Sequence, residues 1–256
     1  MNALTPSRTQ AERADQTRAR ILAAAVRQFS ANGLAGARTE QIAEEAGVNK
    51  ALLYYYFKSK EDLYAAALES VFEDVRVESV AVMEMDATAG ERLVQMTLNS
   101  FDRSYTYPAV RTLMQQEMVR LHQGEENQMA QMAENFFRPM WIKIHELLEK
   151  GIAVGELIAV DPQQIRYATL GANVFYFLTA PLTKLAFGID PMERSELEHR
   201  RKAAVEYLGQ AIFIDREHGA RVAARVLAAT PMPKAAKAEN CKITKDVHKT
   251  DQERHK

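Results

Sequence analysis

The sequence predicts an all-α fold, and three features lead to this prediction. Apolar residues recur at helical spacing along almost the whole chain, and no segment shows sustained two-residue alternation of β-branched side chains. Proline and glycine divide the pattern into helix-length segments. With 256 residues, 47% apolar and 26% charged, the chain is long enough to bury a sizeable core. These values exclude a wholly disordered or collagen-like protein.

The first helix is expected over residues 12–31. It should end at Asn32 and Gly33, because glycine readily takes the left-handed conformation that closes a helix. Residues 1–11, before this helix, are predicted to form a disordered leader. One face of the helix carries the apolar side chains of Ile21, Leu22, Ala25, Val26 and Phe29.

Two short helices separated by a tight turn are predicted next. Thr39 is expected to cap the first helix, Gly47 to supply the positive φ of the turn, and Asn49 to cap the second helix over residues 50–57. This spacing is typical of a helix-turn-helix, whose second helix enters the major groove of DNA. Ser59 should cap a third helix, which extends toward residue 85.

The remaining helices are separated by proline and glycine. They are expected over residues 90–105, 108–123, 126–150, 162–187 and 191–229. Asp161 and Asp190 each precede a proline, a pattern typical of an N-cap followed by the first helical position. Pro139 and Pro181 fall inside helical patterns, so a kink or break is expected near each.

Charge is distributed unevenly along the chain, although the net charge is only −1. Residues 1–60 carry a net +4, residues 61–229 a net −8, and residues 230–256 a net +3. A basic head is what a module that binds a polyanion would show. Together with the helix-turn-helix above, this charge supports a DNA-binding domain at 12–60. The methionine-rich region and the apolar helices described below predict a helical effector-binding and dimerisation domain at 61–229, and the polar, Lys-rich residues 230–256 predict a disordered basic tail.

The second short helix has an outward face with unusual side chains. With Leu53 directed inward, Phe57 lies within about 40° of it at 100° per residue. Tyrosine hydroxyls donate to phosphates and their rings pack on sugars and thymine methyls, so exposed tyrosines here favour DNA contact over solvation. The outward residues are Ala51, Leu52, Tyr54 and Tyr55.

Several residues beside this face are candidates for phosphate contact. Lys50 is placed to meet a guanine edge or a phosphate, and Lys60 lies at a helix N-terminus that favours anions. Arg38 and Thr39 begin the preceding helix and can bind a second phosphate. Tyr56 lies about 60° from the buried direction, so packing and DNA contact remain equally good interpretations.

The run TEQIAEEAGVNKALLYYYFKSKEDLYAAAL, together with the preceding ILAAAVRQFSANGLAGAR, resembles the DNA-binding domain of the TetR family of bacterial transcriptional regulators. The resemblance implies a homodimer with a three-helix DNA-binding domain and a helical domain that binds a small molecule. It implies base or phosphate contacts for Lys50, Ala51, Leu52, Tyr54 and Tyr55, and backbone contacts for Thr39, Tyr56 and Lys60. Leu52 departs from the family, which frequently has Ser or Thr there.

Methionine and aromatic residues are concentrated in the middle of the chain. Methionine adapts to irregular shapes, so this region suits a pocket for a small apolar or amphipathic effector, although the same stripe also fits a plain core. The candidate effector-binding residues are Phe101, Tyr105, Met114, Met118, His122, Phe137, Trp141 and His145.

The last two predicted helices are apolar on more than one side. One face can be covered within the chain, and the other favours a second copy of the chain in a two-fold four-helix interface. The predicted dimer interface consists of Ile165, Thr169, Ala172, Tyr176, Val205, Leu208 and Ile212.

No cofactor, metal or catalytic site is predicted. Cys241 is the single cysteine, and the histidines have no zinc-like spacing. No nucleotide loop, nucleophile elbow or metalloprotease pair occurs. The start of the chain has no signal-like apolar region and no apolar stretch is long enough for a membrane span, so we expect a cytoplasmic protein.

We therefore predict a ligand-responsive repressor that binds a pseudo-palindromic double-stranded DNA operator as a homodimer. Two alternatives remain at this stage. One is a helix-turn-helix regulator controlled by a protein partner instead of a small molecule, and the other is an all-α enzyme that carries a helix-turn-helix.

Overall fold

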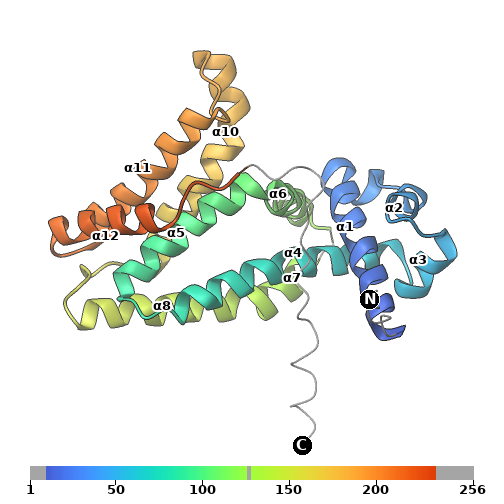
Figure 1. Cartoon of the computed structure of the whole chain (residues 1–256), viewed down its shortest axis with the longest axis horizontal. Coiled ribbons are helices and arrows are strands. Elements are labelled where there is room, and N and C mark those ends of the chain that lie inside the picture. Colours follow the sequence, from blue (N-terminus) through green and yellow to red (C-terminus); the bar gives the residue numbers. More distant parts are fainter. Residues whose placement is uncertain (1–9, 126–127, 235–256) are drawn as a thin grey trace, which may run out of the picture. The chain divides into compact units, whose positions relative to one another are not determined.

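The computed structural model describes residues 10–125 and 128–234, which form helices joined by short loops (Figure 1). This part of the chain contains no β-strand, and its strand-like pairing is limited to an isolated antiparallel bridge between Leu157 and Phe213. The all-α prediction is confirmed. The predicted tail from residue 235 onward and the first nine residues of the predicted leader lie outside the described residues.

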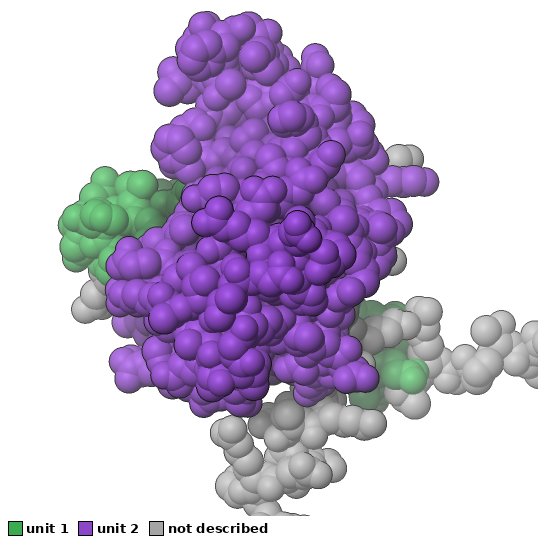
Figure 2. Space-filling model, turned by 90° about the vertical axis from the view of Figure 1, so that its left-hand side faces the viewer, with its two compact units in different colours: residues 1–75, 112–128, 238–256 green, residues 76–111, 129–237 purple. Residues whose placement is uncertain are grey.

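The chain divides into two compact units, which Figure 2 colours separately. The described residues of the first unit are 10–75, 112–125 and 128, and those of the second are 76–111 and 129–234. The expected boundary after residue 60 differs from this division. The first unit extends into the next long helix and includes residues 112–125, which are distant in sequence.

The first unit is built from α1, α2 and α3 together with parts of two further helices. Leu53 of α3 and Ile42 of α2 are fully buried, which stabilises the unit by about 1.5–3 kcal/mol for each side chain. Arg27 of α1 pairs with Glu45 of α2, so the two helices are also joined at the surface. The bounds are α1 (Gln10–Gly36), α2 (Thr39–Glu45), α3 (Lys50–Tyr56), α4 (Lys60–Met83) and α6 (Pro108–His122).

The structure differs from three of the predicted helix boundaries in this unit: the start of α1, the end of α1 and the N-cap of α2. α1 already begins at Gln10, inside the predicted leader, and it continues past Gly33, which has φ 67° and marks a kink. Thr39 is not the N-cap of α2: Arg38 occupies that position in an extended conformation, and Thr39 is the first helical residue. The hydroxyl of Thr39 lies 3.3 Å from that of Tyr54, so it is engaged away from the helix end.

The other local signals in this unit are confirmed. Gly47 has φ 65°, which only glycine adopts without strain. Asn49 Oδ1 accepts from the backbone N–H of Leu52 at 2.7 Å, and Ser59 Oγ accepts from that of Asp62 at 3.0 Å. These caps start α3 and α4 at the positions that the sequence indicated.

The second unit is a helical assembly whose main core lies between α5, α8, α11 and α12. Leu98, Leu148 and Val205 are among the side chains buried there. Figure 1 shows α12 beside α11 and α5, in agreement with their shared core cluster. The bounds are α5 (Ala89–Thr106), α7 (Met129–Met132), η1 (Ala133–Phe137), α8 (Arg138–Ala153), α9 (Pro162–Arg166), η2 (Tyr167–Gly171), α10 (Ala172–Phe187), α11 (Arg194–Ile212) and α12 (Arg216–Ala229).

Two helices predicted as continuous contain π-helical turns. In the first, η1 lies directly before Pro139, so the expected disturbance near that proline is found. In the second, the π-helical turn is η2, whereas α10 continues through Pro181. The interruption in this helix therefore lies about three to four turns before Pro181, the residue that the sequence indicated.

The predicted helix over residues 191–229 is in fact two helices. Asp190 does not cap a helix, because α11 begins at Arg194 with Glu193 as its N-cap. A break at residues 213–215 separates α11 from α12, and Asp215 caps α12 by accepting from two backbone N–H groups. The chain reverses here because two glycines allow close contact: a Cβ on Gly219 would lie 1.9 Å from the carbonyl oxygen of Gly209.

Candidate nucleic-acid interface

The recognition helix α3 is oriented by two buried side chains. Leu53 is fully buried and Phe57 nearly so, which anchors one side of the helix to the first unit. Arg18 lies over the Phe57 ring, 5.3 Å from its centroid, and covers the end of the helix. The opposite side of α3 is consequently turned to solvent.

The outward side of α3 carries the predicted aromatic residues. Tyr55 is 81% exposed and Tyr54 is 37% exposed, while Ala51 and Leu52 are also exposed. Tyr56 is half-buried and packs edge-to-face on Tyr55, with ring centroids 5.5 Å apart. Tyr55 therefore projects from a supported position, which suits insertion into a groove.

Tyr54 is held by α2. Its hydroxyl lies 3.3 Å from Thr39 Oγ1, and Thr39 is buried. The ammonium of Lys50 lies 5.9 Å from the Tyr54 ring centroid and pairs with Glu40. Because these contacts fix three candidate residues together, the start of α2 and the outward side of α3 form one surface.

The two outer candidates for phosphate contact differ in their surroundings. Arg38 is exposed at the N-terminus of α2. Lys60 is half-buried, and its Nζ donates to the carbonyl oxygen of Ala35 at 3.2 Å. This hydrogen bond connects the end of α1 to the start of α4. The sequence did not indicate this structural role of Lys60.

The candidate effector residues are distributed over both units. Met114, Met118 and His122 lie in the first unit, where His122 is exposed and its Nδ1 lies 2.7 Å from the carbonyl oxygen of Met118. The other candidates lie in the second unit, so the two groups are described separately.

The candidate effector residues of the second unit differ in their surroundings, and the expectation for Phe101 is corrected. Phe101 has no exposed surface because it packs against Phe177 and Leu197, so it is a core residue in this conformation. Tyr105 packs at the edge of the same cluster. Phe137 and Trp141 stack with ring centroids 5.6 Å apart. His145 is exposed, and its Nε2 lies 3.1 Å from Oε1 of Glu149 on the same helix.

Sequence reasoning missed arginines near these aromatic residues. Arg166 lies over the Trp141 ring, 4.0 Å from its centroid, and Arg111 lies over the Phe177 ring at 5.0 Å. Burial lowers the pKa of Arg111. No sequence signal identified these contacts, because each joins residues far apart in the chain.

The predicted dimer interface needs correction for α11. Val205, Leu208 and Ile212 are buried in the core of the second unit, so they cannot contact a second copy. Ile165 packs against the same core, and the Tyr176 hydroxyl donates to the carbonyl oxygen of Pro191 at 2.6 Å. Of the predicted α9–α10 set, Thr169 is half-buried and Ala172 is exposed.

Exposed apolar side chains also lie on α10 and at the start of η2, on the side opposite to the residues of α10 that are buried in the second unit. From Phe175 to Leu185 they recur at three- and four-residue spacing, which places them on one face. Val174 precedes Phe175, and Tyr167 lies seven residues before Val174, on η2. The set consists of Tyr167, Val174, Phe175, Leu178, Leu182 and Leu185, which are 45–85% exposed. We call this set the α10 stripe.

The described residues also bear on two other kinds of site, for metal ions and for membranes. They contain no group of three or more His, Cys, Asp or Glu side chains that could hold a metal ion. In the same residues, no helix has the length and apolar character to cross a bilayer.

An all-helical chain with a helix-turn-helix, whose second helix presents tyrosines and a lysine, defines the class of DNA-binding regulators. Two family models match the chain: bacterial regulatory proteins of the tetR family over residues 21–67, and the tetracyclin repressor-like C-terminal domain over residues 89–208. Together they span more than half of the chain, which belongs to the TetR family. Regulators of this family bind DNA operators and act as dimers.

Individual relatives agree with this assignment. The transcriptional repressor NicS of Pseudomonas putida is 36% identical over 115 residues, which are 44% of this chain and 53% of that protein. The chain thus aligns with about half the length of this relative. The regulator RutR of Escherichia coli is 29% identical over 168 residues, or 66% of this chain and 77% of its own.

Solved structures agree in fold. A crystal structure of an ArpA-like gamma-butyrolactone receptor superposes with a TM-score of 0.61 at 20% identity, covering 85% of this chain and all of that one. A TetR regulator from Chloroflexus aurantiacus superposes with the same TM-score at 20% identity, covering 79% of this chain and 98% of its own.

Proposed function

We propose that this protein is a ligand-responsive repressor that binds a pseudo-palindromic operator as a homodimer in the cytoplasm. The observation that carries the proposal is the outward face of α3, where Tyr55 is 81% exposed while Leu53 beneath it is fully buried. Repression is supported by the similarity to NicS, which is described as a transcriptional repressor.

DNA contact in this proposal uses the surface formed by α2 and α3. Tyr54, Tyr55, Ala51 and Leu52 face base edges and sugars, and Lys50 reaches the adjacent edge or phosphate. Two such helices in a dimer read half-sites about 34–36 Å apart, or a multiple of that distance. Arg38, Thr39, Tyr56 and Lys60 hold the DNA backbone in this arrangement.

Replacing Tyr55 by alanine is expected to weaken operator binding by about 1–3 kcal/mol per half-site. The folded state should change by less than about 0.5 kcal/mol, because the ring is mostly exposed. The measurement is fluorescence anisotropy with a duplex that the wild-type protein selects from random-sequence DNA. Tyr207→Ala, which removes a 73% exposed tyrosine from α11, is the control.

Two results would contradict this proposal for α3. The selection could return no enriched pseudo-palindrome, in which case operator recognition itself is wrong. Alternatively, Tyr55→Ala could bind the selected duplex as tightly as Tyr207→Ala does, in which case the outward face of α3 does not contact the bases.

The dimer interface is proposed to be formed by the α10 stripe. Contiguous exposed apolar side chains of this size mark interaction surfaces, and each member is accessible in a single copy. A two-fold pairing of α10 helices buries the stripe against itself, since a two-fold interface uses the same patch on both copies.

Leu182→Arg is expected to convert the dimer to a monomer in light scattering after size exclusion. Operator affinity should then fall by about 100-fold or more, because the advantage of binding two half-sites together is lost. Leu182 is 63% exposed, so the fold should persist. Val154→Arg, at a 77% exposed apolar site outside the stripe, should remain dimeric. A dimeric Leu182→Arg protein would refute the interface.

The effector is proposed to contact partly exposed aromatic residues of the second unit. Tyr105, Phe137 and Trp141 supply apolar surface, and Arg166 over the Trp141 ring adds a cation beside it. An effector acts by binding better to a conformation that does not fit the operator, and it shifts the equilibrium by its difference in affinity at most. His145 of the same unit remains part of this proposal. Met114, Met118 and His122 belong to the first unit and remain a separate set of candidate effector contacts.

A further inference from the structure

An acidic residue lies inside the surface that is proposed to face DNA. Glu40, in the first turn of α2, pairs through Oε1 with the ammonium of Lys50 at the start of α3. The two residues are ten positions apart and are brought together by the turn at Gly47. Their side chains are 60% and 52% exposed, respectively, so the pair lies at the surface.

Glu40 is connected to the recognition face by a chain of polar contacts. Thr39 Oγ1 lies 3.5 Å from Glu40 Oε2 and 3.3 Å from the hydroxyl of Tyr54. The Lys50 ammonium lies 5.9 Å from the Tyr54 ring centroid. Three of the proposed DNA-contacting residues, Thr39, Lys50 and Tyr54, therefore surround one carboxylate.

This carboxylate is ionised near neutral pH, and it changes what Lys50 offers to DNA. The hydrogen bond from Lys50 and its charge lower the pKa of Glu40, and Glu40 raises the pKa of Lys50 in return. A lysine that approaches phosphates attracts every DNA sequence alike, because the backbone charge carries no sequence information. A paired lysine contributes much less to this general attraction.

We propose that Glu40 is a specificity-determining residue of the DNA interface. By pairing with Lys50 it offsets the attraction of that ammonium for the phosphates of any sequence, and it positions the ammonium beside Tyr54, at the edge of the helix that reads the bases. This inference rests on the proposed DNA contact of α3. On non-operator DNA the nearby carboxylate weakens binding. The operator offsets this effect because it supplies a base acceptor for the oriented ammonium.

If the Glu40–Lys50 pair had a purely structural role, its loss would change the stability of the fold and not the binding of DNA. Exposed ion pairs contribute little to stability, so loss of Glu40 should leave the melting temperature within about 2 °C of the wild-type value. The effect should be found in DNA binding, and chiefly in binding to sequences that lack the operator.

The test compares Glu40→Gln with Glu44→Gln, both of which remove one exposed negative charge from α2. No acceptor or donor contact of the Glu44 side chain is found in the described part of the chain, so this variant reports the effect of charge alone. Each protein is titrated with the selected operator duplex and with a scrambled duplex of equal length and composition, over a series of potassium chloride concentrations.

For Glu40→Gln we expect about fivefold tighter binding of the scrambled duplex at low salt, the size of one unit-charge interaction at about 4 Å in water. The slope of log K against log salt should become steeper by about 0.9 for each subunit on the DNA. Operator binding should rise less or fall, so the ratio between the two duplexes decreases. Glu44→Gln should change neither duplex by more than about twofold.

A double variant, Glu40→Gln with Lys50→Gln, identifies the group that is released. The gain on scrambled DNA should disappear in it, because the ammonium that produced the gain is absent. If the gain persists, or if Glu40→Gln matches Glu44→Gln, the inference for Glu40 is wrong although the DNA-binding function stands. If the wild-type protein itself does not distinguish the two duplexes, the proposed function and the inference both fail.

Discussion

Replacing Arg201 by alanine is expected to lower the free energy of unfolding by about 3–5 kcal/mol. Arg201 of α11 is nearly buried, and its Nε and Nη2 donate to the two carboxylate oxygens of Asp102 on α5, at 2.6 and 2.7 Å. Nη2 also donates to the carbonyl oxygen of Thr230 at 2.8 Å. Without Arg201, the Asp102 carboxylate is left in a largely desolvated position with no counter-charge.

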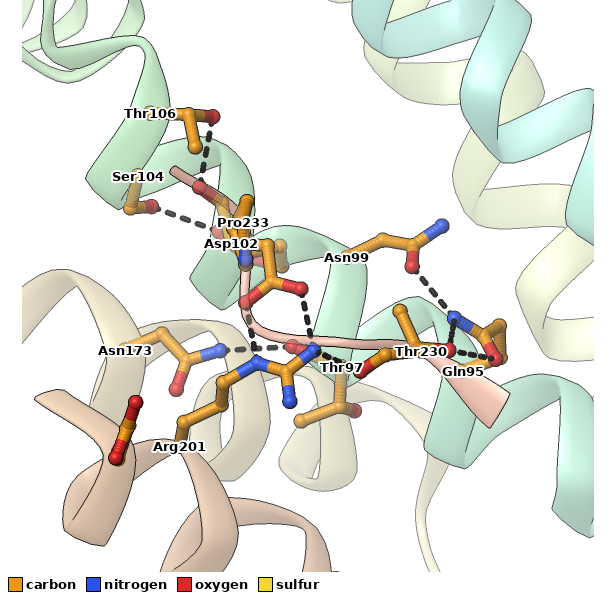
Figure 3. A network of polar contacts seen from close by, with 12 residues as sticks. Gln95, Thr97, Asn99, Asp102, Ser104, Thr106, Asn173, Arg201, Thr230 and Pro233 are labelled. Atoms are coloured by element: carbon orange, nitrogen blue, oxygen red, sulfur yellow. Dashed lines mark hydrogen bonds and ion pairs between the residues drawn. The ribbon is translucent and has the colours of Figure 1, made fainter. Parts of the chain in front are cut away.

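Figure 3 shows why the effect should extend beyond one pair. Arg201 lies between Asp102 and the chain that follows α12, so it joins α5, α11 and the end of α12. On the same helix α5, the carbonyl oxygen of Thr97 accepts from Asn173 Nδ2 of α10 at 3.1 Å. The network therefore connects four helices of the second unit.

The measurement for Arg201→Ala is urea unfolding followed by circular dichroism. The adjacent Lys202→Ala is the control, because its ion pair with Glu206 is exposed and is expected to contribute about 0–1 kcal/mol. The double variant Arg201→Met with Asp102→Leu should recover most of the stability, since no charge remains buried. A loss below about 1 kcal/mol in Arg201→Ala would show that the pair is not desolvated in solution.

Replacing Glu117 by alanine is expected to cost the first unit about 3 kcal/mol. Glu117 of α6 is fully buried, and it accepts from the hydroxyl of Tyr64 on α4 at 2.8 Å and from Arg120 Nη1 at 2.7 Å. The estimate combines a buried hydroxyl without its acceptor, about 1–3 kcal/mol, with the loss of one buried methylene at about 0.8 kcal/mol.

The position of Tyr64 transmits this loss to the DNA-binding helices. Tyr64 packs edge-to-face on Phe29 of α1, with ring centroids 4.9 Å apart, and both side chains are buried. Burial, followed by the neighbouring Glu117, raises the pKa of Tyr64, so its phenol remains a donor at neutral pH. Loosening α6 therefore disturbs the contact between α1 and α4.

Glu125→Ala is a matched control for Glu117→Ala. Glu125 accepts from the same Arg120, at 2.9 Å, but its side chain is 52% exposed. Its removal should cost at most about 1 kcal/mol. Chemical denaturation of the full chain, with hydrogen exchange to localise the loss to α1, α4 and α6, provides the measurement. Equal effects of the two substitutions would mean that α6 does not complete the core of the first unit.

The helix-turn-helix was predictable because its signals are local. Gly47, Asn49 and Ser59 act within a turn of their own positions, and the spacing of Leu53 and Phe57 identifies the buried side of α3 without reference to other helices. The outward position of Tyr55 followed from that geometry. Thr39 was misassigned as a cap, because its hydroxyl is engaged by Tyr54 fifteen residues later.

The helices of the second unit were less predictable, because several of them are apolar on more than one side. Periodicity alone could not decide which side of the helices in residues 162–187 and 191–229 faces the core. For α11, the face predicted to contact a second copy of the chain is the one buried in the core of the second unit. The break at residues 213–215 was also missed. Its signal is the N-cap Asp215, but the helical pattern on both sides of it obscured the reversal.

By itself, the sequence determined the helical class, the position of the DNA-binding motif and the outward side chains of its second helix, because these depend on dihedral preferences and spacing within a few residues. Tertiary structure alone decided that α6 completes the first unit through Glu117, that Arg201 binds Asp102, and that Glu40 meets Lys50. These contacts join residues 10 to 99 positions apart, and which side chains meet across such separations depends on how whole helices pack.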